Sequence, residues 1–231
     1  MRSLNILLAL SAAALTAACG SDNGTTGSTG TITPPPTAST PSVSIDSGFE
    51  ARTAVVGSTI PANVHVAVNG VPTGGITVTW NVSTSGGTAN PTTSVTDANG
   101  FATTQWTLND TVRVSTLTAA VVNASSVTLQ VTTIGGAATT VAKVTADSVA
   151  VVAGASTLIT VRVKDKAGNP VTGATITWTK SGGGALTAAT TTTGSSGNGQ
   201  VVFSTDPTPK SYTVTATAGS LGSLTFKVVG L

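Results

Sequence analysis

The sequence predicts an all-β protein made of two tandem Greek-key β-sandwiches, and three observations support this. From Val43 onward, short runs alternate in polarity. For example, Val64, Val66 and Val68 alternate with Asn63, His65 and Ala67. A period of two with Val and Thr enrichment is typical of strands. Gly, Asn, Asp and Pro separate the runs, and no segment beyond the N-terminus has a helical stripe of apolar residues.

The third observation is an internal repeat. Residues 72–80 (PTGGITVTW) match residues 170–178 (PVTGATITW) at a constant offset of 98, and further segments match at an offset of 97. We therefore predict two copies of one domain, at residues 43–135 and 139–231. About seven short strands in each copy, with frequent turn residues, are typical of a sandwich.

Each copy has one tryptophan on its third strong strand, Trp80 and Trp178, which we predict to be core anchors that face the opposite sheet. The only cysteine is Cys19, so no intrachain disulfide can support either core. Aromatic residues make up only 3% of the chain. The cores must therefore come from Val, Ile, Leu and the few aromatic residues.

The composition argues against several classes of function. Only 8% of residues are charged and the net charge is +2, which gives no electrostatic basis for nucleic-acid binding. The only histidine is His65, which we expect to face outward because Val64 and Val66 face inward. No nucleophile motif lies near it, so we interpret His65 as an ordinary surface residue. We predict that the protein is not an enzyme.

Sequence motifs for metals and phosphates are also weak. Asp97–Gly100 shares part of a calcium-loop pattern but lacks the other ligands, so we expect a tight turn. We likewise interpret Asp165–Asn169 as a hairpin turn with solvated charges. The glycine clusters at 86–87 and 182–184 lack the helix that a phosphate-binding loop needs. The eight acidic residues are dispersed. We predict no metal and no cofactor.

The sequence pattern at the N-terminus predicts that the protein is exported from the cytoplasm. A basic start is followed by an apolar run, Leu4–Ala18, of about fifteen residues, which is shorter than the roughly 20 residues of a membrane-spanning helix. This pattern is typical of a signal peptide. Residues 15–19 (LTAAC) resemble a bacterial lipobox. The resemblance implies that the signal peptide, residues 1–18, is removed and that the Cys19 sulfur carries a diacylglycerol.

A plain signal peptide with a chance cysteine is the alternative. Gly20, rather than an aspartate, follows the cysteine, which in enteric-type sorting favours the outer membrane of a Gram-negative bacterium. The next residues, up to 42, are rich in Gly, Ser, Thr and Pro and show no apolar periodicity. We therefore expect residues 19–42 to form a lipidated, disordered tether.

The second repeat resembles the bacterial Ig-like domain of group 1, which recurs in intimin- and invasin-type surface proteins. The residues that carry the resemblance are 161–165 (VRVKD), 168–178 (GNPVTGATITW), 193–194 (TG), 199–201 (GQV) and 212–216 (YTVTA). The first repeat matches less well, and Ser115 stands where Tyr212 would align. The resemblance implies Ig-like sandwiches that act as rigid spacers or adhesive stalks.

We therefore expect a non-catalytic, lipid-anchored cell-envelope protein that presents Ig-like modules for adhesion or as a structural spacer. The alternative is a surface module that binds a glycan or matrix polymer. Phe101 is a weak candidate contact residue, because it lies on the strand face opposite to Trp106 and carbohydrate sites often use exposed aromatic rings. Expected partners are the membrane, through the anchor, and a surface protein or polysaccharide, but no nucleic acid.

Overall fold

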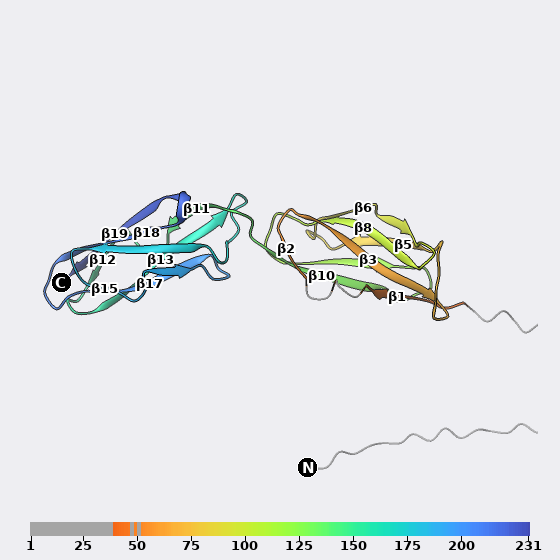
Figure 1. The fold of residues 1–231 in the computed structure, drawn as a ribbon, viewed down its shortest axis with the longest axis horizontal. Helices are drawn as coiled ribbons and strands as arrows, with labels where there is room; N and C mark the ends of the chain where they lie inside the picture. The colour runs from red at the N-terminus through yellow and green to blue at the C-terminus, as the bar shows by residue number, and fades with distance from the viewer. Residues whose placement is uncertain (1–38, 47–48, 50–51) are drawn as a thin grey trace, which may run out of the picture. The chain divides into compact units, whose positions relative to one another are not determined.

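The computed structural model describes residues 39–46, 49 and 52–231, and it confirms the expected all-β class (Figure 1). In this part of the chain one short 3₁₀ turn, Gly219–Leu221, accompanies the strands. None of the described residues forms a helix long and apolar enough to cross a bilayer. The predicted signal peptide, Cys19 and residues 20–38 of the tether lie outside the described residues.

The first sandwich contains strands β1 to β10, in two sheets. One sheet has the order β1 (Pro41–Ile45), β3 (Thr59–Val68), β8 (Phe101–Thr107) and β6 (Thr88–Asn90), with β4 (Val71–Pro72) paired to β3. The other has the order β2 (Arg52–Val55), β10 (Val127–Ile134), β9 (Val114–Ala120), β5 (Thr77–Val82) and β7 (Thr93–Val95). Strand β2 runs parallel to β10, and the other pairs are antiparallel.

The second sandwich repeats this strand order, as the internal repeat predicts. One sheet has the order β11 (Ala138–Lys143), β13 (Ser156–Asp165), β17 (Asn198–Ser204) and β15 (Ala185–Leu186). The other has the order β12 (Ser148–Val151), β19 (Ser223–Gly230), β18 (Ser211–Thr217), β14 (Thr175–Ser181) and β16 (Thr190–Thr192). Strand β12 is parallel to β19, as β2 is to β10.

An equivalent indole ring lies in the core of each sandwich, and the first sandwich also buries Trp106. Trp80 on β5 and Trp178 on β14 are each 2% exposed and belong to separate apolar clusters. The Nε1–H of Trp80 donates to Ser94 Oγ at 2.8 Å, and that of Trp178 donates to Thr191 Oγ1 at 2.8 Å. Both hydroxyls come from the adjacent edge strand. Each ring is therefore buried without leaving its polar atom unpaired.

The two cores are filled differently where Ser115 replaces Tyr212. In the second sandwich, Tyr212 packs edge-on against Phe203 with ring centroids 5.2 Å apart, and its hydroxyl accepts a hydrogen bond from Asp206 N. This is the arrangement of a tyrosine corner. In the first sandwich, the larger Trp106 occupies the position of Phe203, and it stacks on Phe49. Ser115 is 1% exposed and its hydroxyl has no hydrogen-bond partner.

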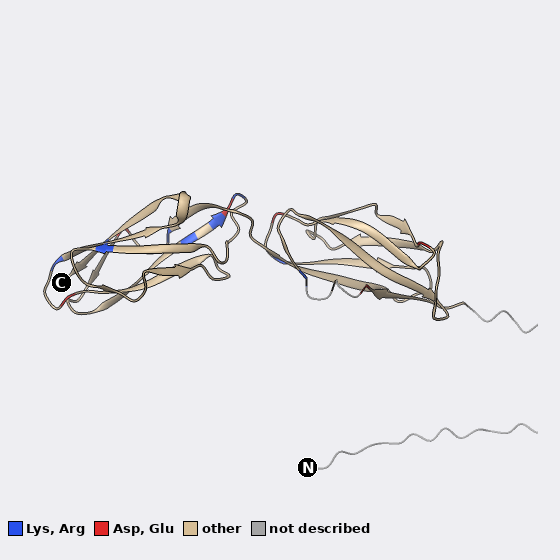
Figure 2. Cartoon of the chain, in the orientation of Figure 1, with Lys and Arg blue, Asp and Glu red and all other residues tan. Residues whose placement is uncertain are grey.

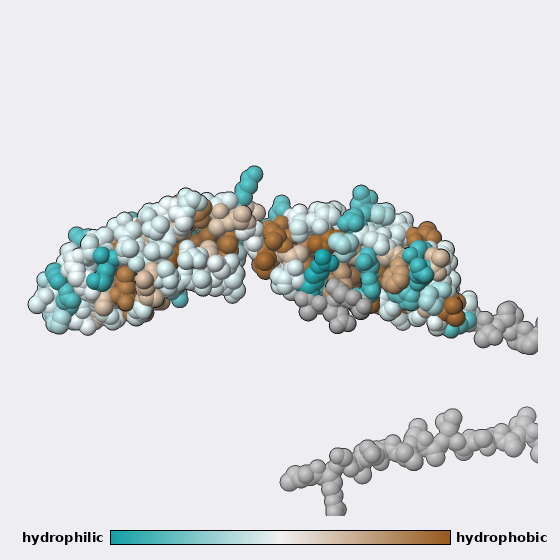
Figure 3. Space-filling view, in the orientation of Figure 1, coloured by the Kyte–Doolittle hydropathy of each residue, from teal (hydrophilic) through white to brown (hydrophobic). Residues whose placement is uncertain are grey.

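The outward positions of the strands are mostly uncharged. Alternate residues of β14, β16, β18 and β19 turn away from the core, and many are threonines: Thr175, Thr177, Thr179, Thr190, Thr192, Thr213, Thr215, Thr217 and Thr225. Charged residues are sparse on both sandwiches (Figure 2), and the visible surface is largely of intermediate hydropathy (Figure 3). Alternation thus places apolar groups inside and hydroxyl groups outside.

Replacing Trp178 tests how much the buried indole ring contributes to the stability of the second sandwich. Trp178→Ala should lower the free energy of unfolding of the second sandwich by about 3–5 kcal/mol, because it removes a buried ring and leaves a cavity. Urea denaturation followed by circular dichroism would measure this. A loss below about 1 kcal/mol would contradict the burial of this side chain.

Removing the unpaired hydroxyl of Ser115 should cost little. Ser115→Ala is expected to change the free energy of unfolding of the first sandwich by less than about 1 kcal/mol, or to raise it. The matched control is Thr96→Val, because Thr96 Oγ1 accepts from Ile76 N and donates to Thr73 O. That variant should lose about 1–3 kcal/mol. Equal losses in both variants would contradict this account.

Candidate functional site

His65 and Phe101 form a small aromatic pair on the outward face of the first sandwich. They are paired residues of β3 and β8, and their ring centroids are 4.9 Å apart. The His65 Nε2 atom lies 3.1 Å from the carbonyl oxygen of Asn99. No hydrogen bond among the described residues joins this imidazole to a carboxylate or a serine hydroxyl. The pair therefore offers an exposed apolar contact rather than acid–base chemistry.

The loop before Phe101 is a closed turn. One carboxylate oxygen of Asp97 accepts hydrogen bonds from the backbone N–H groups of Asn99 and Phe101, both at 2.9 Å. The Gly100 N–H donates to the Asp97 carbonyl, and Gly100 has a φ of 79°. Across residues 39–46, 49 and 52–231, no three His, Cys, Asp or Glu side chains gather closely enough to hold a metal ion.

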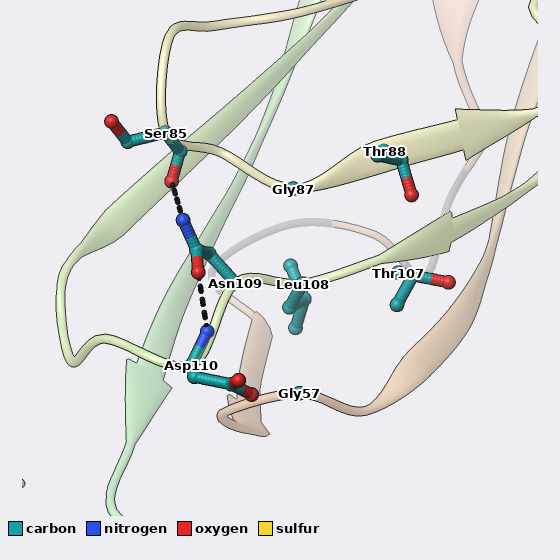
Figure 4. A pocket seen from close by; sticks show the side chains of 8 residues that line it. All are labelled: Gly57, Ser85, Gly87, Thr88, Thr107, Leu108, Asn109 and Asp110. Carbon is teal, nitrogen blue, oxygen red and sulfur yellow. Dashed lines mark hydrogen bonds between the residues drawn. The ribbon is translucent and has the colours of Figure 1, made fainter. Parts of the chain in front are cut away.

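A hollow of about 370 Å³ lies beside the first glycine cluster (Figure 4). A Cβ atom at Gly87 would collide with the Thr107 carbonyl, so close backbone packing explains this glycine. The Asn109 side chain donates to the Ser85 carbonyl at 3.2 Å and accepts from Asp110 N at 2.7 Å. The Asn109 amide is thus engaged with the chain itself, and the hollow holds no acid–base pair.

The most extensive polar network surrounds Asp165, at the end of β13. Its side chain is 5% exposed, which corrects the prediction of a solvated turn charge. One oxygen accepts from the N–H groups of Ala167 and Asn169, and the other accepts from Gly136 N and the Asn169 amide. Burial raises the pKa of Asp165, but these hydrogen bonds outweigh burial and hold the pKa below its ordinary value of 3.8.

Asn169 extends this network to the first sandwich. Its side-chain nitrogen donates to the Asp110 carbonyl at 2.6 Å, and its side-chain oxygen accepts from Val112 N at 3.1 Å. The same nitrogen also donates to the Asp165 carboxylate at 3.0 Å. The Asp165 and Asn169 side chains therefore connect the loop after β8 with the segment that enters the second sandwich. We call this network the Asp165–Asn169 joint.

The comparisons with known proteins agree with this architecture. Residues 136–229 match the family model described as "Bacterial Ig-like domain (group 1)". The matched residues include nearly all of the second sandwich. This confirms the resemblance seen in the sequence. No curated protein matches the chain.

Solved structures extend the likeness to both sandwiches. The Escherichia coli adhesin FdeC aligns with a TM-score of 0.61 and 19% identity, over 84% of this chain and 63% of that chain. Yersinia pseudotuberculosis InvD aligns with a TM-score of 0.54 and 17% identity, over 83% of this chain and 57% of that chain. These likenesses show a shared fold. This chain thus spans about three-fifths of each of those two structures.

A glycosyl hydrolase family 2 member from Bacteroides cellulosilyticus also aligns, over 77% of this chain and 24% of that chain. Its TM-score of 0.39 and 13% identity are too low to support an argument about activity. The bacterial Ig-like domain of group 1 is a non-enzymatic family.

The Asp165–Asn169 joint predicts a pH dependence. Because the folded-state pKa of Asp165 is lowered, its stabilising effect is present above pH 3.8 and is lost as the pH falls through the lower, folded-state value. Asp165→Asn should lower the free energy of unfolding at pH 7 by about 1–3 kcal/mol, because an amide N–H₂ would face existing donors. This difference should shrink toward pH 2.

Urea denaturation of both proteins at pH 7 and pH 2 would measure the effect. Asp147→Asn is a suitable control because the Asp147 side chain is 85% exposed, and it should change stability by less than about 0.5 kcal/mol. A loss in Asp165→Asn that is the same at both pH values would contradict the role of the charge.

Proposed function

We propose that this protein is a non-catalytic component of the bacterial cell envelope that presents two Ig-like modules for adhesion or as a structural spacer. The observation that carries the proposal is the repetition of one sandwich topology, with the two copies connected through the Asp165–Asn169 joint. A repeated module with a hydrogen-bonded connection extends a chain without adding chemistry. The adhesin folds that align with it support a surface role.

We propose that the protein acts by presenting the surfaces of its two modules to a binding partner. The outward faces carry threonine hydroxyls and few charges, so they offer hydrogen-bonding groups without a strong electrostatic preference. A partner would be held by complementary contacts with loops or sheet faces. A surface protein or a polysaccharide of the envelope or of a neighbouring cell fits this description, and nucleic acid does not, because the net charge of the chain is only +2.

We further propose that a lipid on Cys19 holds the protein to the membrane, on the outer membrane of a Gram-negative bacterium. The lipobox-like residues 15–19 and the position of the only cysteine directly after two alanines support this assignment. Each buried methylene of an acyl chain contributes about 0.8 kcal/mol, so two or more chains anchor a protein firmly.

Cys19→Ala tests the anchor directly. The wild-type chain, expressed in a Gram-negative host, should sediment with membranes and float with them in a density gradient. The variant should appear in the soluble fraction, because it has no sulfur to acylate. Metabolic labelling with a fatty acid provides a second measurement. Equal flotation of both proteins, or absence of label from the wild type, would contradict lipidation.

A further inference from the structure

Four loop segments gather at one end of the first sandwich, at residues 39–41, 68–76, 95–101 and 120–127. Hydrogen bonds join them: Asn69 N donates to Thr40 O at 3.2 Å, and Gly75 N donates to Thr96 O at 2.9 Å. The fourth segment is included because Val121, Val122 and Asn123 line one hollow with Ser39, Pro41 and Ile76. We call these four segments the tether-end surface, since the described chain begins there.

Four exposed apolar side chains belong to this surface. Val71 is 64% exposed, Val95 60%, Phe101 40% and Val122 81%. Figure 3 shows hydrophobic residues at this end of the first sandwich. A single exposed valine is ordinary on a soluble domain. Val71 on β4, Val95 at the end of β7, Phe101 at the start of β8 and Val122 in the loop after β9 together give this end of the sandwich apolar groups suited to an apolar partner.

Charge is nearly absent from the same surface. The four segments contain no Lys or Arg and one carboxylate, Asp97, which accepts two backbone hydrogen bonds. Figure 2 shows no basic residue at this end. The opposite end of the sandwich differs, because Arg52, Asp110 and Arg113 lie there. The tether-end surface is therefore suited to contact through burial of apolar area, with little dependence on salt.

The length of the preceding chain indicates what this surface meets. Residues 20–38 separate Cys19 from Ser39, and fully extended they span at most about 65 Å. If Cys19 carries the lipid, the tether-end surface is the part of the described chain tied most closely to the bilayer. An anchored protein meets that bilayer at high effective concentration, so a weak apolar contact is sufficient.

We propose that the tether-end surface rests on the bilayer that holds the anchor, with Val71, Val95, Phe101 and Val122 at the boundary between headgroups and acyl chains. This inference rests on the proposed lipidation of Cys19. The lipid contact is apolar and does not require anionic headgroups. It gives the first sandwich a second attachment to the membrane and determines which of its ends faces the lipid.

An environment-sensitive dye at position 122 tests the contact. Because the Cys19 sulfur would be acylated, Val122→Cys introduces the one free thiol, which is labelled with nitrobenzoxadiazole in the full lipidated chain. The labelled protein is then reconstituted in phosphatidylcholine vesicles. We expect a blue-shifted emission and at least twofold stronger quenching by nitroxide lipids than for the same dye at Val152→Cys. Val152 is 70% exposed in the second sandwich and is the matched control.

Adding Val71→Asp and Val95→Asp should reduce the quenching at position 122 to the level of the control, while the protein still floats with the vesicles. Salt at 1 M should leave the wild-type signal unchanged. If the protein floats with the vesicles but nitroxide lipids quench the dye at position 122 no more than the control dye, the contact is overturned. The proposed lipid anchor would then still stand. Failure to float would overturn both proposals. A blue shift that depends on protein concentration without vesicles would instead assign the surface to a second copy of the chain.

Discussion

The burial of an equivalent indole ring in each sandwich, Trp80 in the first and Trp178 in the second, is the constraint on which the rest of the structure depends. The only cysteine lies outside the described residues, so each core depends on packing, and Trp80 and Trp178 are among the largest side chains in their clusters. Each ring needs a partner for its N–H, and an edge-strand hydroxyl provides it. This requirement connects the core strand β5 or β14 with the edge strand β7 or β16. Aliphatic side chains and the other buried aromatic rings, such as Trp106 in the first core and Phe203 in the second, fill the remaining space.

Because each core is stabilised by internal packing, the outward side chains contribute little to the fold, and few of them are charged. The polar groups that are buried serve the architecture: Asp165 and Asn169 connect successive segments, and Thr96 and Thr193 close equivalent loops in the two sandwiches. His65 lies beside Phe101 without a proton-relay partner among the described residues. This division between a packed interior and a hydroxyl-rich exterior fits a protein that works by presenting surfaces.

Much of this architecture could be predicted from the sequence, because period-two alternation and an internal repeat are local signals. The inward direction of Trp106 and the outward direction of Phe101 followed from alternation along a single strand. The Asp165–Asn169 joint could not be predicted in this way. Asp165 meets Gly136, which lies 29 residues away, and Asn169 meets Asp110, which lies 59 residues away. The exchange of Phe203 for Trp106 and of Tyr212 for Ser115 likewise could not be related from the sequence, because these positions lie on strands of opposite sheets.

Protease accessibility on intact cells tests the central claim, which is that the Ig-like modules are displayed from the cell surface. Cells expressing the full chain are treated with a protease that cannot cross the outer membrane, and residues 139–231 are detected with an antibody. The account predicts that this region is lost from intact cells while a periplasmic marker is preserved. Protection until the outer membrane is opened would contradict surface display and would indicate a role facing the periplasm.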